Sequence, residues 1–271
     1  MQFLIFGKSG QVARELACLP IEARFLSRED VDLERTGAAE AAILAHKPDA
    51  VINAAAWTNV DGAETDEARA TLVNGLSPTE MARATATLNI PFVHLSTDYV
   101  FDGTGVTGFD PEDATNPLGA YGRSKLAGET GVQDAGLTYA ILRTSWVFSS
   151  HGSNFVKTML RLSETKDTLT IVADQIGGPT PAAEIAAAAA TMAQALARDP
   201  LLTGLYHFSG RPDVSWADFA RAIFRLSDRK VTVSDIATAD YPTPAARPAN
   251  SRGRLSRLRR ATSTLSASRR A

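Results

Sequence analysis

Two side chains at helical spacing suggest proton transfer. Tyr121 and Lys125 are four residues apart, about one turn of an α-helix, so on a helix they would share a face. A phenol loses its proton near pH ~10, and a neighbouring cation favours the phenolate. Such a pair could donate a proton to a carbonyl under reduction. The same spacing also occurs by coincidence on solvated helix faces, so the surrounding elements must decide.

A glycine turn near the start of the chain predicts a cofactor site. An apolar run at residues 2–6 predicts a strand, and a helix is expected from about Arg14. Glycines between them allow the backbone to approach a pyrophosphate, whose charge the helix amides can meet. A plain loop is the alternative. The predicted phosphate-binding residues are Gly7, Lys8, Ser9, Gly10, Gln11 and Val12.

The end of the second predicted strand, residues 23–26, bears on cofactor choice. It ends in Ser27 and Arg28, with no carboxylate where an NAD-binding protein would hold the ribose. This pair suits the 2′-phosphate of NADPH, whereas Asp32 just beyond could restore an NADH-like contact or be a surface carboxylate. Further cofactor contacts are predicted at Leu33 and, after the buried strand 48–53, at Asn53, Ala54, Ala55 and Ala56.

Later strand ends predict the substrate side of the site. Thr97 falls at the carboxyl end of the strand that starts at Pro91, where open parallel sheets keep their active sites. The Gly- and Pro-containing loop 102–119 is expected to cap the site. Trp146 follows the strand 137–142 and would either pack in the core or form a pocket wall. On the helix 66–88, a structural or catalytic role of Asn74 is as probable as an exposed one.

Alternating strands and helices predict an α/β fold: a Rossmann-type doubly wound parallel sheet with a smaller C-terminal substrate-binding lobe. We expect the dinucleotide-binding domain over residues 1–150 and mainly the substrate-binding lobe over 151–271, with a strand near 204–208 returning to the first domain. The four histidines show no metal-ligand spacing and are predicted to be structural or surface residues: His46, His94, His151 and His207.

Several of these stretches, in this order, resemble the extended short-chain dehydrogenase/reductase superfamily and, within it, the family that reduces dTDP-4-dehydrorhamnose. The resemblance covers residues 1 to about 251. The segments that carry it are 7–12, 53–61, 96–101, Tyr121 with Lys125, 143–147 and 242–251. Ala13 stands where the family has a third glycine, a small change that leaves the turn possible.

The resemblance implies a function. It implies reduction of the C4 keto group of a dTDP-linked 4-keto-6-deoxy sugar by NADPH or NADH, with Thr97, Tyr121 and Lys125 as the catalytic triad. The alternatives are a nucleotide-sugar epimerase or dehydratase, and a non-catalytic NADP-binding regulatory subunit. The expected substrate contacts are Thr58, Val60, Thr97, Asp98, Tyr99, Trp146, Asn154, Gln175 and Arg247.

The resemblance also raises the questions of metal, assembly and chain end. Some members of the family are linked to Mg²⁺ and to dimers through glutamates. Glu15 and Glu184 could correspond to these glutamates. We expect a possible homodimer and assign no metal site. Residues 252–271 contain no acid, unlike the family's acidic and aromatic ending. Our hypothesis is that a shifted reading frame produced this ending. Resequencing of the coding DNA would exclude it if the frame is intact and close relatives share the same ending.

Composition excludes several classes of protein. The 271-residue chain has a formal net charge of −2, so nothing indicates a nucleic-acid partner. The single Cys18 excludes an internal disulfide. No secretory signal begins the sequence, and the Ala-rich run 182–197 carries Glu184 and falls short of a membrane span. We therefore expect a soluble, cytoplasmic protein without a membrane partner.

Overall fold

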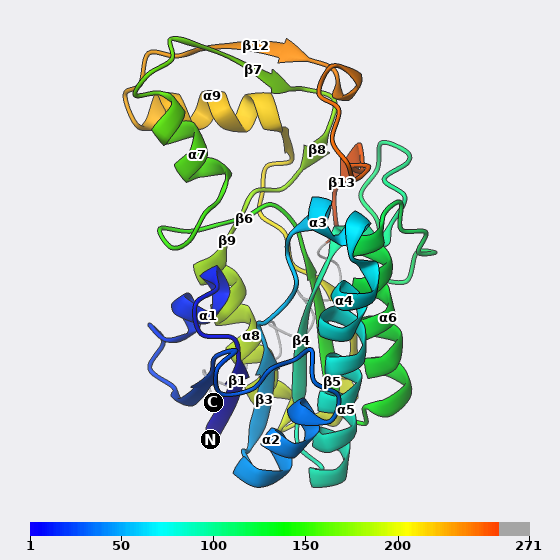
Figure 1. Ribbon diagram of the computed structural model, residues 1–271. Coiled ribbons are helices and arrows are strands. Elements are labelled where there is room, and N and C mark those ends of the chain that lie inside the picture. Colours follow the sequence, from blue (N-terminus) through cyan, green and yellow to red (C-terminus); the bar gives the residue numbers. More distant parts are fainter. Residues whose placement is uncertain (255–271) are drawn as a thin grey trace.

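A six-stranded parallel sheet forms the centre of the computed structural model, which describes residues 1–254 (Figure 1). Every neighbouring pair of its strands is parallel. The strand order reverses between β1 and β3, which is the position where open α/β sheets bind ligands. In spatial order the strands are β10 (Gly204–His207), β5 (Tyr139–Thr144), β4 (Phe92–Thr97), β3 (Ala50–Asn53), β1 (Gln2–Phe6) and β2 (Glu22–Leu26).

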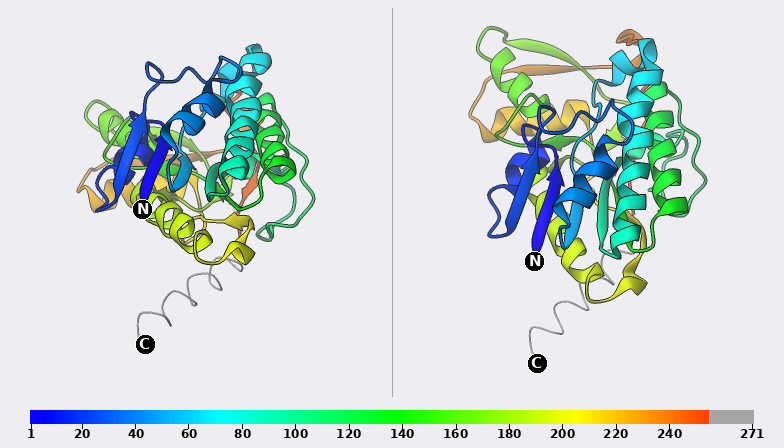
Figure 2. Two further views of the ribbon diagram at one scale, coloured as in Figure 1. Left: turned by 90° about the horizontal axis from the view of Figure 1, so that it is seen from below. Right: turned by 60° about the horizontal axis from the view of Figure 1, so that its bottom comes forward.

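Helices cover both faces of this sheet (Figures 1 and 2). Because side chains alternate along a strand, Phe3 and Ile5 pack with one group of helices and Leu4 and Phe6 with the other. Apolar residues on both faces explain why the strands are continuous hydrophobic runs. The predicted fold class is confirmed. The first group is α1 (Gln11–Leu16) and α8 (Ala182–Leu196); the second is α2 (Ala38–His46), α5 (Ser77–Leu88) and α6 (Ala120–Ala135).

The helix expected over residues 66–88 is interrupted. After α3 (Val60–Thr65) and α4 (Glu67–Thr71), a π-helical turn at Leu72–Leu76 precedes α5. Asn74 in this turn is 1% exposed. Its Oδ1 accepts from the Trp57 amide at 2.9 Å, and its Nδ2 donates to the Trp57 carbonyl at 3.0 Å. Asn74 is therefore a structural residue that fixes the loop after β3.

A second, smaller group of elements lies beyond the carboxyl ends of the main sheet (Figure 1). It has an apolar core of its own and a parallel pair of strands. The proposed limits at residues 150 and 151 stay a prediction. Its main elements are α7 (Phe155–Leu162), β7 (Thr168–Val172), α9 (Trp216–Leu226) and β12 (Thr232–Ile236); short strands are β6 (Val147–Phe148), β8 (Ile176–Gly177), β9 (Thr180–Pro181), β11 (Val214–Ser215) and β13 (Asn250–Ser251).

The loop 102–119 differs from its expected role as a cap. It pairs with the end of the described chain: Phe109 donates to the Arg252 carbonyl at 2.9 Å, and Arg254 donates to the Phe109 carbonyl at 2.8 Å. Residues 255–271, and with them most of the segment for which we suggest a frame shift, lie outside the described residues. No helix within residues 1–254 is long and apolar enough to cross a membrane.

Candidate active site

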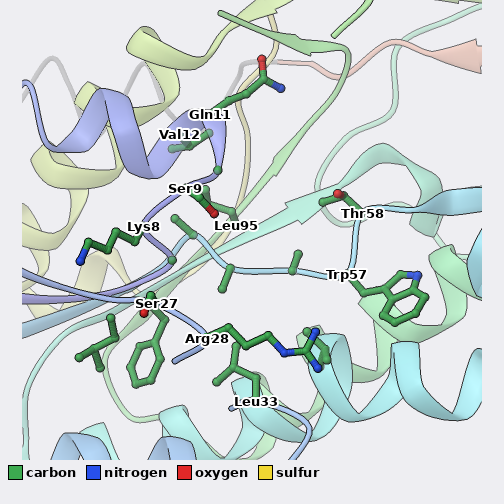
Figure 3. A pocket seen from close by; sticks show the side chains of 18 of the residues that line it. Lys8, Ser9, Gln11, Val12, Ser27, Arg28, Leu33, Trp57, Thr58 and Leu95 are labelled. Atoms are coloured by element: carbon green, nitrogen blue, oxygen red, sulfur yellow. The ribbon is translucent and has the colours of Figure 1, made fainter. Parts of the chain in front are cut away.

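A cavity of about 820 Å³ opens at the carboxyl ends of the main-sheet strands (Figure 3). Its volume is in the range of small-molecule and cofactor sites. None of its lining residues comes from the loop 102–119. Segments that line it are Gly7–Val12 after β1, Ser27 and Arg28 after β2, Ala54–Thr58 after β3, Leu95 and Ser96 of β4, Thr144 of β5, Tyr121 and Lys125 of α6, and Gly152 with Ser153.

The turn after β1 depends on Gly7. Its φ of +107° lies in the region that favours glycine. A Cβ at this position would lie 3.1 Å from the carbonyl carbon and oxygen of Ala54. The glycine and the small alanines therefore let two loops meet at the switch point and leave backbone open to a ligand, as the sequence predicts.

Charged residues after β2 form one rim of the cavity. Arg28 contacts Glu34 at 2.6 Å and Asp32 at 3.8 Å. Figure 3 shows its side chain reaching toward the end of the cavity where Trp57 lies. Asp30 accepts from the amide and hydroxyl of Ser27, which lowers the pKa of its carboxyl. The rim thus offers one cation, already paired with two carboxylates.

Tyr121 and Thr97 meet beside this cavity. The Thr97 side chain is close enough to the Tyr121 phenol to influence its pKa. The helix carrying Tyr121 can approach because the next residue is Gly122, whose Cβ would lie 2.2 Å from the Tyr99 carbonyl oxygen. Burial, and secondarily the carboxylate of Asp98, raises the pKa of Tyr121, and the Thr97 side chain opposes the shift.

Lys125 lines the cavity but is bound at its base. Its Nζ donates to the Leu95 carbonyl at 2.7 Å and lies 3.3 Å from Nε2 of His94. Burial lowers the pKa of Lys125 to about 8, and Glu129 opposes this shift. The sequence predicts that Lys125 lowers the phenol pKa of Tyr121. In the structure burial is the largest cause of the shift in the Tyr121 pKa, and Lys125 does not contribute because its amine is held by the Leu95 carbonyl.

The residues after Thr97 form a polar cluster with the loop before β13. The Thr97 hydroxyl donates to Asp98 at 3.1 Å and accepts from the Tyr99 amide at 3.2 Å. Burial raises the pKa of Asp98 to about 6 and that of Tyr99 to about 12. Arg247 contacts Asp61 at 2.8 Å and lies close enough to Tyr99 to oppose the rise in its pKa. Three expected substrate contacts, Asp98, Tyr99 and Arg247, are thus brought beside Thr97.

The remaining predicted substrate contacts do not line the cavity. Trp146 stacks on Trp216 with 3.5 Å between ring centroids. Gln175 accepts from the Trp216 indole at 3.2 Å. Asn154 caps α7 and donates to Gln11 at 2.8 Å, which ties the second group of elements to the glycine turn. Val60 begins α3.

The group of possible metal ligands that contains Glu15 does not fit Mg²⁺. Glu15, Cys18 and His151 offer ligand atoms that lie within 4.8 Å of one another, a group that excludes Glu184. Mg²⁺ prefers oxygen ligands, whereas thiol and imidazole suit softer metals. This donor set therefore gives no support for Mg²⁺, for which the sequence assigned no site.

Sequence reasoning missed several residues of the site. Thr144 ends β5 and lines the cavity, so the strand-end rule applied to Thr97 could have found it. Trp57 follows the alanine run and also lines the cavity. Asn53, predicted to bind the cofactor, is fully buried and bonds His94 instead. No sequence signal pointed to His94, because its partners come from other elements.

Comparison with known proteins gives consistent matches. The family model described as RmlD substrate binding domain matches residues 1–270. A dTDP-4-dehydrorhamnose reductase of Sinorhizobium fredii is 44% identical, covering 96% of this chain and 91% of its own. The crystal structure of a Clostridium acetobutylicum dTDP-4-dehydrorhamnose reductase has a TM-score of 0.91 at 35% identity and covers 97% and 93% of the two chains. A Bacillus anthracis dTDP-4-dehydrorhamnose reductase in complex with NADP has a TM-score of 0.89 at 33% identity, with 95% and 92% covered. This chain therefore belongs to the RmlD family, which is the family of the dTDP-4-dehydrorhamnose reductases.

Proposed function

We propose that this protein reduces the C4 keto group of dTDP-4-dehydrorhamnose to give dTDP-L-rhamnose, with a reduced nicotinamide cofactor. The observation that carries the proposal is that Tyr121, with Thr97 close by, lines the cavity that begins at the Gly7 turn. This arrangement supports Tyr121 as a proton donor to a substrate in a cavity of a size suited to a dinucleotide. The family membership and the names of the relatives support the same sugar substrate.

The chemistry follows from the position of each group. When bound, the reduced nicotinamide supplies the hydride that reaches C4 of the sugar. Tyr121, whose raised pKa keeps the phenol protonated at neutral pH, donates its proton to the alkoxide oxygen that forms. Thr97 hydrogen-bonds that oxygen as charge develops on it. Lys125 would hold the nicotinamide ribose once its side chain turns from the base into the cavity.

We propose NADPH as the preferred cofactor. Arg28 lies on the rim with 65% of its side chain exposed, so its guanidinium can bind a 2′-phosphate in two-point geometry. Asp32 and Glu34 already pair with this cation and oppose a further anion. NADH therefore remains a second substrate. The preference for NADPH over NADH is smaller than an unpaired arginine would provide.

We propose that the elements around α7 and α9 form the substrate lobe. Trp146, Gln175 and Asn154 belong to this side of the molecule, and Arg247 lies between it and Thr97. Arg247 binds a diphosphate only by exchanging its contact with Asp61. The homodimer is a further part of the proposal, and the mass measured by light scattering would test it.

Replacement of the proton donor tests the proposed reaction. We expect Tyr121→Phe to lower kcat by about 10²–10⁴-fold, because a positioned acid contributes about this much. The measurement is loss of nicotinamide absorbance with the dTDP-4-keto sugar, supplied with NADPH and then with NADH. Cofactor affinity, followed by fluorescence titration, is expected to change little.

A matched control is Tyr241→Phe, since Tyr241 is 59% exposed and lies outside the cavity lining. Near-normal turnover in Tyr121→Phe with cofactor bound would remove the phenol from the mechanism. Tightly bound NAD in the purified protein, without oxidation of added NADPH, would favour an epimerase or dehydratase. A copurifying partner without any sugar turnover would favour a regulatory subunit.

A further inference from the structure

Three buried polar side chains meet beneath the cavity. Asn53 on β3 and His94 on β4 are partners in the strand register, and Lys125 comes from α6, which covers this face. Their exposed fractions are 0%, 0% and 2%. Buried polar groups of this kind need hydrogen-bond partners, so the protons among them are tightly constrained.

The orientation of Asn53 fixes the protonation of His94. The Ala55 backbone N–H, which can only donate, lies 3.1 Å from Oδ1 of Asn53. The amide nitrogen of Asn53 therefore faces Nδ1 of His94, at 3.1 Å, and donates to it. Burial, and secondarily Lys125, lowers the pKa of His94 well below its ordinary value, so the ring is neutral. A neutral imidazole has one donor and one acceptor; with Nδ1 accepting, Nε2 carries the proton.

The His94 Nε2–H points toward the amine of Lys125, at 3.3 Å between nitrogens. An ammonium group has three donors and no acceptor, so it would meet this N–H as donor against donor. A neutral amine has a lone pair for His94 and an N–H for the Leu95 carbonyl, which is 2.7 Å from Nζ. Only the neutral lysine satisfies both contacts.

We propose that His94 is a positioning residue for Lys125: oriented by Asn53, it donates from Nε2 to the amine and stabilises the neutral form of Lys125 at the base of the cavity relative to the ammonium. Protonation of Lys125 removes the lone pair, breaks this contact and frees the side chain to turn into the cavity that it lines. There its charge can act on Tyr121. His94 therefore sets the equilibrium between a neutral Lys125 bound at the base of the cavity and an ammonium that turns toward Tyr121.

The other charges near Lys125 do not supply this effect. On α6, Glu129 favours the ammonium and so opposes the neutral form. Glu129 is itself paired with Arg143 of β5 at 2.6 Å, and β3 contributes the uncharged Asn53. Asp98, after β4, acts on Tyr121. His94 is thus the contact among these that favours the neutral amine by hydrogen bonding.

Nitrogen chemical shifts in the unmodified protein test the proposed tautomer directly. The chain has four histidines, so a ¹⁵N-histidine-labelled sample gives few signals, and His94→Gln identifies those of His94. We expect Nε2 of His94 to show the shift of a protonated nitrogen and Nδ1 that of an unprotonated one. The reverse assignment would overturn the proposal.

The effect of His94 on the protonation of Lys125 is tested by the pKa of Lys125. This pKa is read from the Nζ chemical shift as a function of pH. We expect His94→Leu to raise this pKa by about one pH unit, the size of one lost buried hydrogen bond. His94→Gln, whose side-chain NH₂ replaces the Nε2–H donor, should give a smaller rise, and His46→Gln on α2 none. A lowered or unchanged pKa in His94→Leu contradicts the proposal, since an accepting His94 would shift it downward.

The kinetic consequence rests on the proposed function. The pH profile of kcat/KM for the sugar should move with the Lys125 pKa in the same order of variants. If the unmodified protein reduces no sugar, the proposed function fails, whereas the two spectroscopic results still decide whether His94 holds Lys125. If the shifts hold and the profile does not move, the proposed link from His94 through Lys125 to catalysis is wrong.

Discussion

Asp98, the neighbour of Thr97, is buried close to the proposed active site, and its burial lowers the stability of the fold. Asp98 lies next to the proposed proton donor, and burial raises its pKa from 3.8 to about 6. Hydrogen bonds from Thr97 and Ser251 oppose this shift without cancelling it. The carboxyl is therefore half protonated at about pH 6.

This shift predicts a pH dependence of stability. The folded state holds the Asp98 proton more tightly than the unfolded state, so its stabilising contribution is complete below pH ~4 and is lost as pH rises through ~6. The loss by neutral pH is about 3 kcal/mol in unfolding free energy. Asp98→Asn removes this contribution. The unfolding free energy in urea is measured for the unmodified protein and for Asp98→Asn. The first value minus the second should fall between about pH 4 and about pH 6.5. A constant difference would show that Asp98 is not shifted upward.

Elements α6, β4 and β5 are joined by a buried ion pair behind the active site. Arg143 on β5 and Glu129 on α6 are 4% and 1% exposed and form hydrogen bonds as short as 2.6 Å. Ser96, adjacent to Thr97, donates to the same carboxylate at 2.5 Å. Arg143 also donates to the Pro111 carbonyl at 2.9 Å, which anchors the loop before α6. The pair thus holds in place the strand and helix that carry Thr97, Tyr121 and Lys125.

Breaking this pair should be costly. We expect Arg143→Met to lower the unfolding free energy by about 3–5 kcal/mol, because it leaves the Glu129 carboxylate buried and unpaired. The exposed pair Arg123–Glu67 provides the control, with side chains 46% and 42% exposed; Arg123→Met should cost at most about 1 kcal/mol. Adding Glu129→Gln to Arg143→Met should recover part of the loss in urea denaturation. Equal losses in the two single variants would contradict the assignment.

At the scale of the whole molecule, the cavity is assembled from the sheet and from the segment that leads to the second group of elements. The Gly7–Val12 turn lies on one side of it and Gly152 with Ser153 on another. Asn154 joins the two sides through Gln11. A ligand that occupies this cavity contacts both parts, so its binding free energy adds to the stability of the whole fold.

Cofactor binding should therefore stabilise the protein, and Arg28 should decide which cofactor does so more. At 100 times its dissociation constant, a ligand adds about 2.7 kcal/mol to the unfolding free energy. At fixed concentrations, we expect Arg28→Ala to reduce the rise in Tm caused by NADPH and to leave that caused by NADH nearly unchanged. Arg198→Ala, at an exposed position outside the cavity, is the control. An equal reduction for both cofactors would show that Arg28 does not contact the 2′-phosphate.

The sequence by itself determined the features that depend on short stretches of backbone. The spacing of Tyr121 and Lys125 follows from the turn of a helix, and the location of Thr97 from the end of a strand. The sequence predicted the glycine turn from its place between a strand and a helix, and the structure added the positive φ of Gly7. The α/β order of elements follows from the same local patterns. The family resemblance added the sugar substrate.

Only the tertiary structure decided which distant side chains meet. Lys125 contacts His94 across 31 residues, Asn74 contacts Trp57 across 17, and Arg247 contacts Asp61 across 186. It also decided that Trp146 stacks on Trp216 and that burial dominates the Tyr121 pKa. Helical or strand periodicity carries no record of such pairs, because they are set by how the helices pack on the sheet. The proton arrangement around Lys125 therefore becomes visible only when β3, β4 and α6 are brought together.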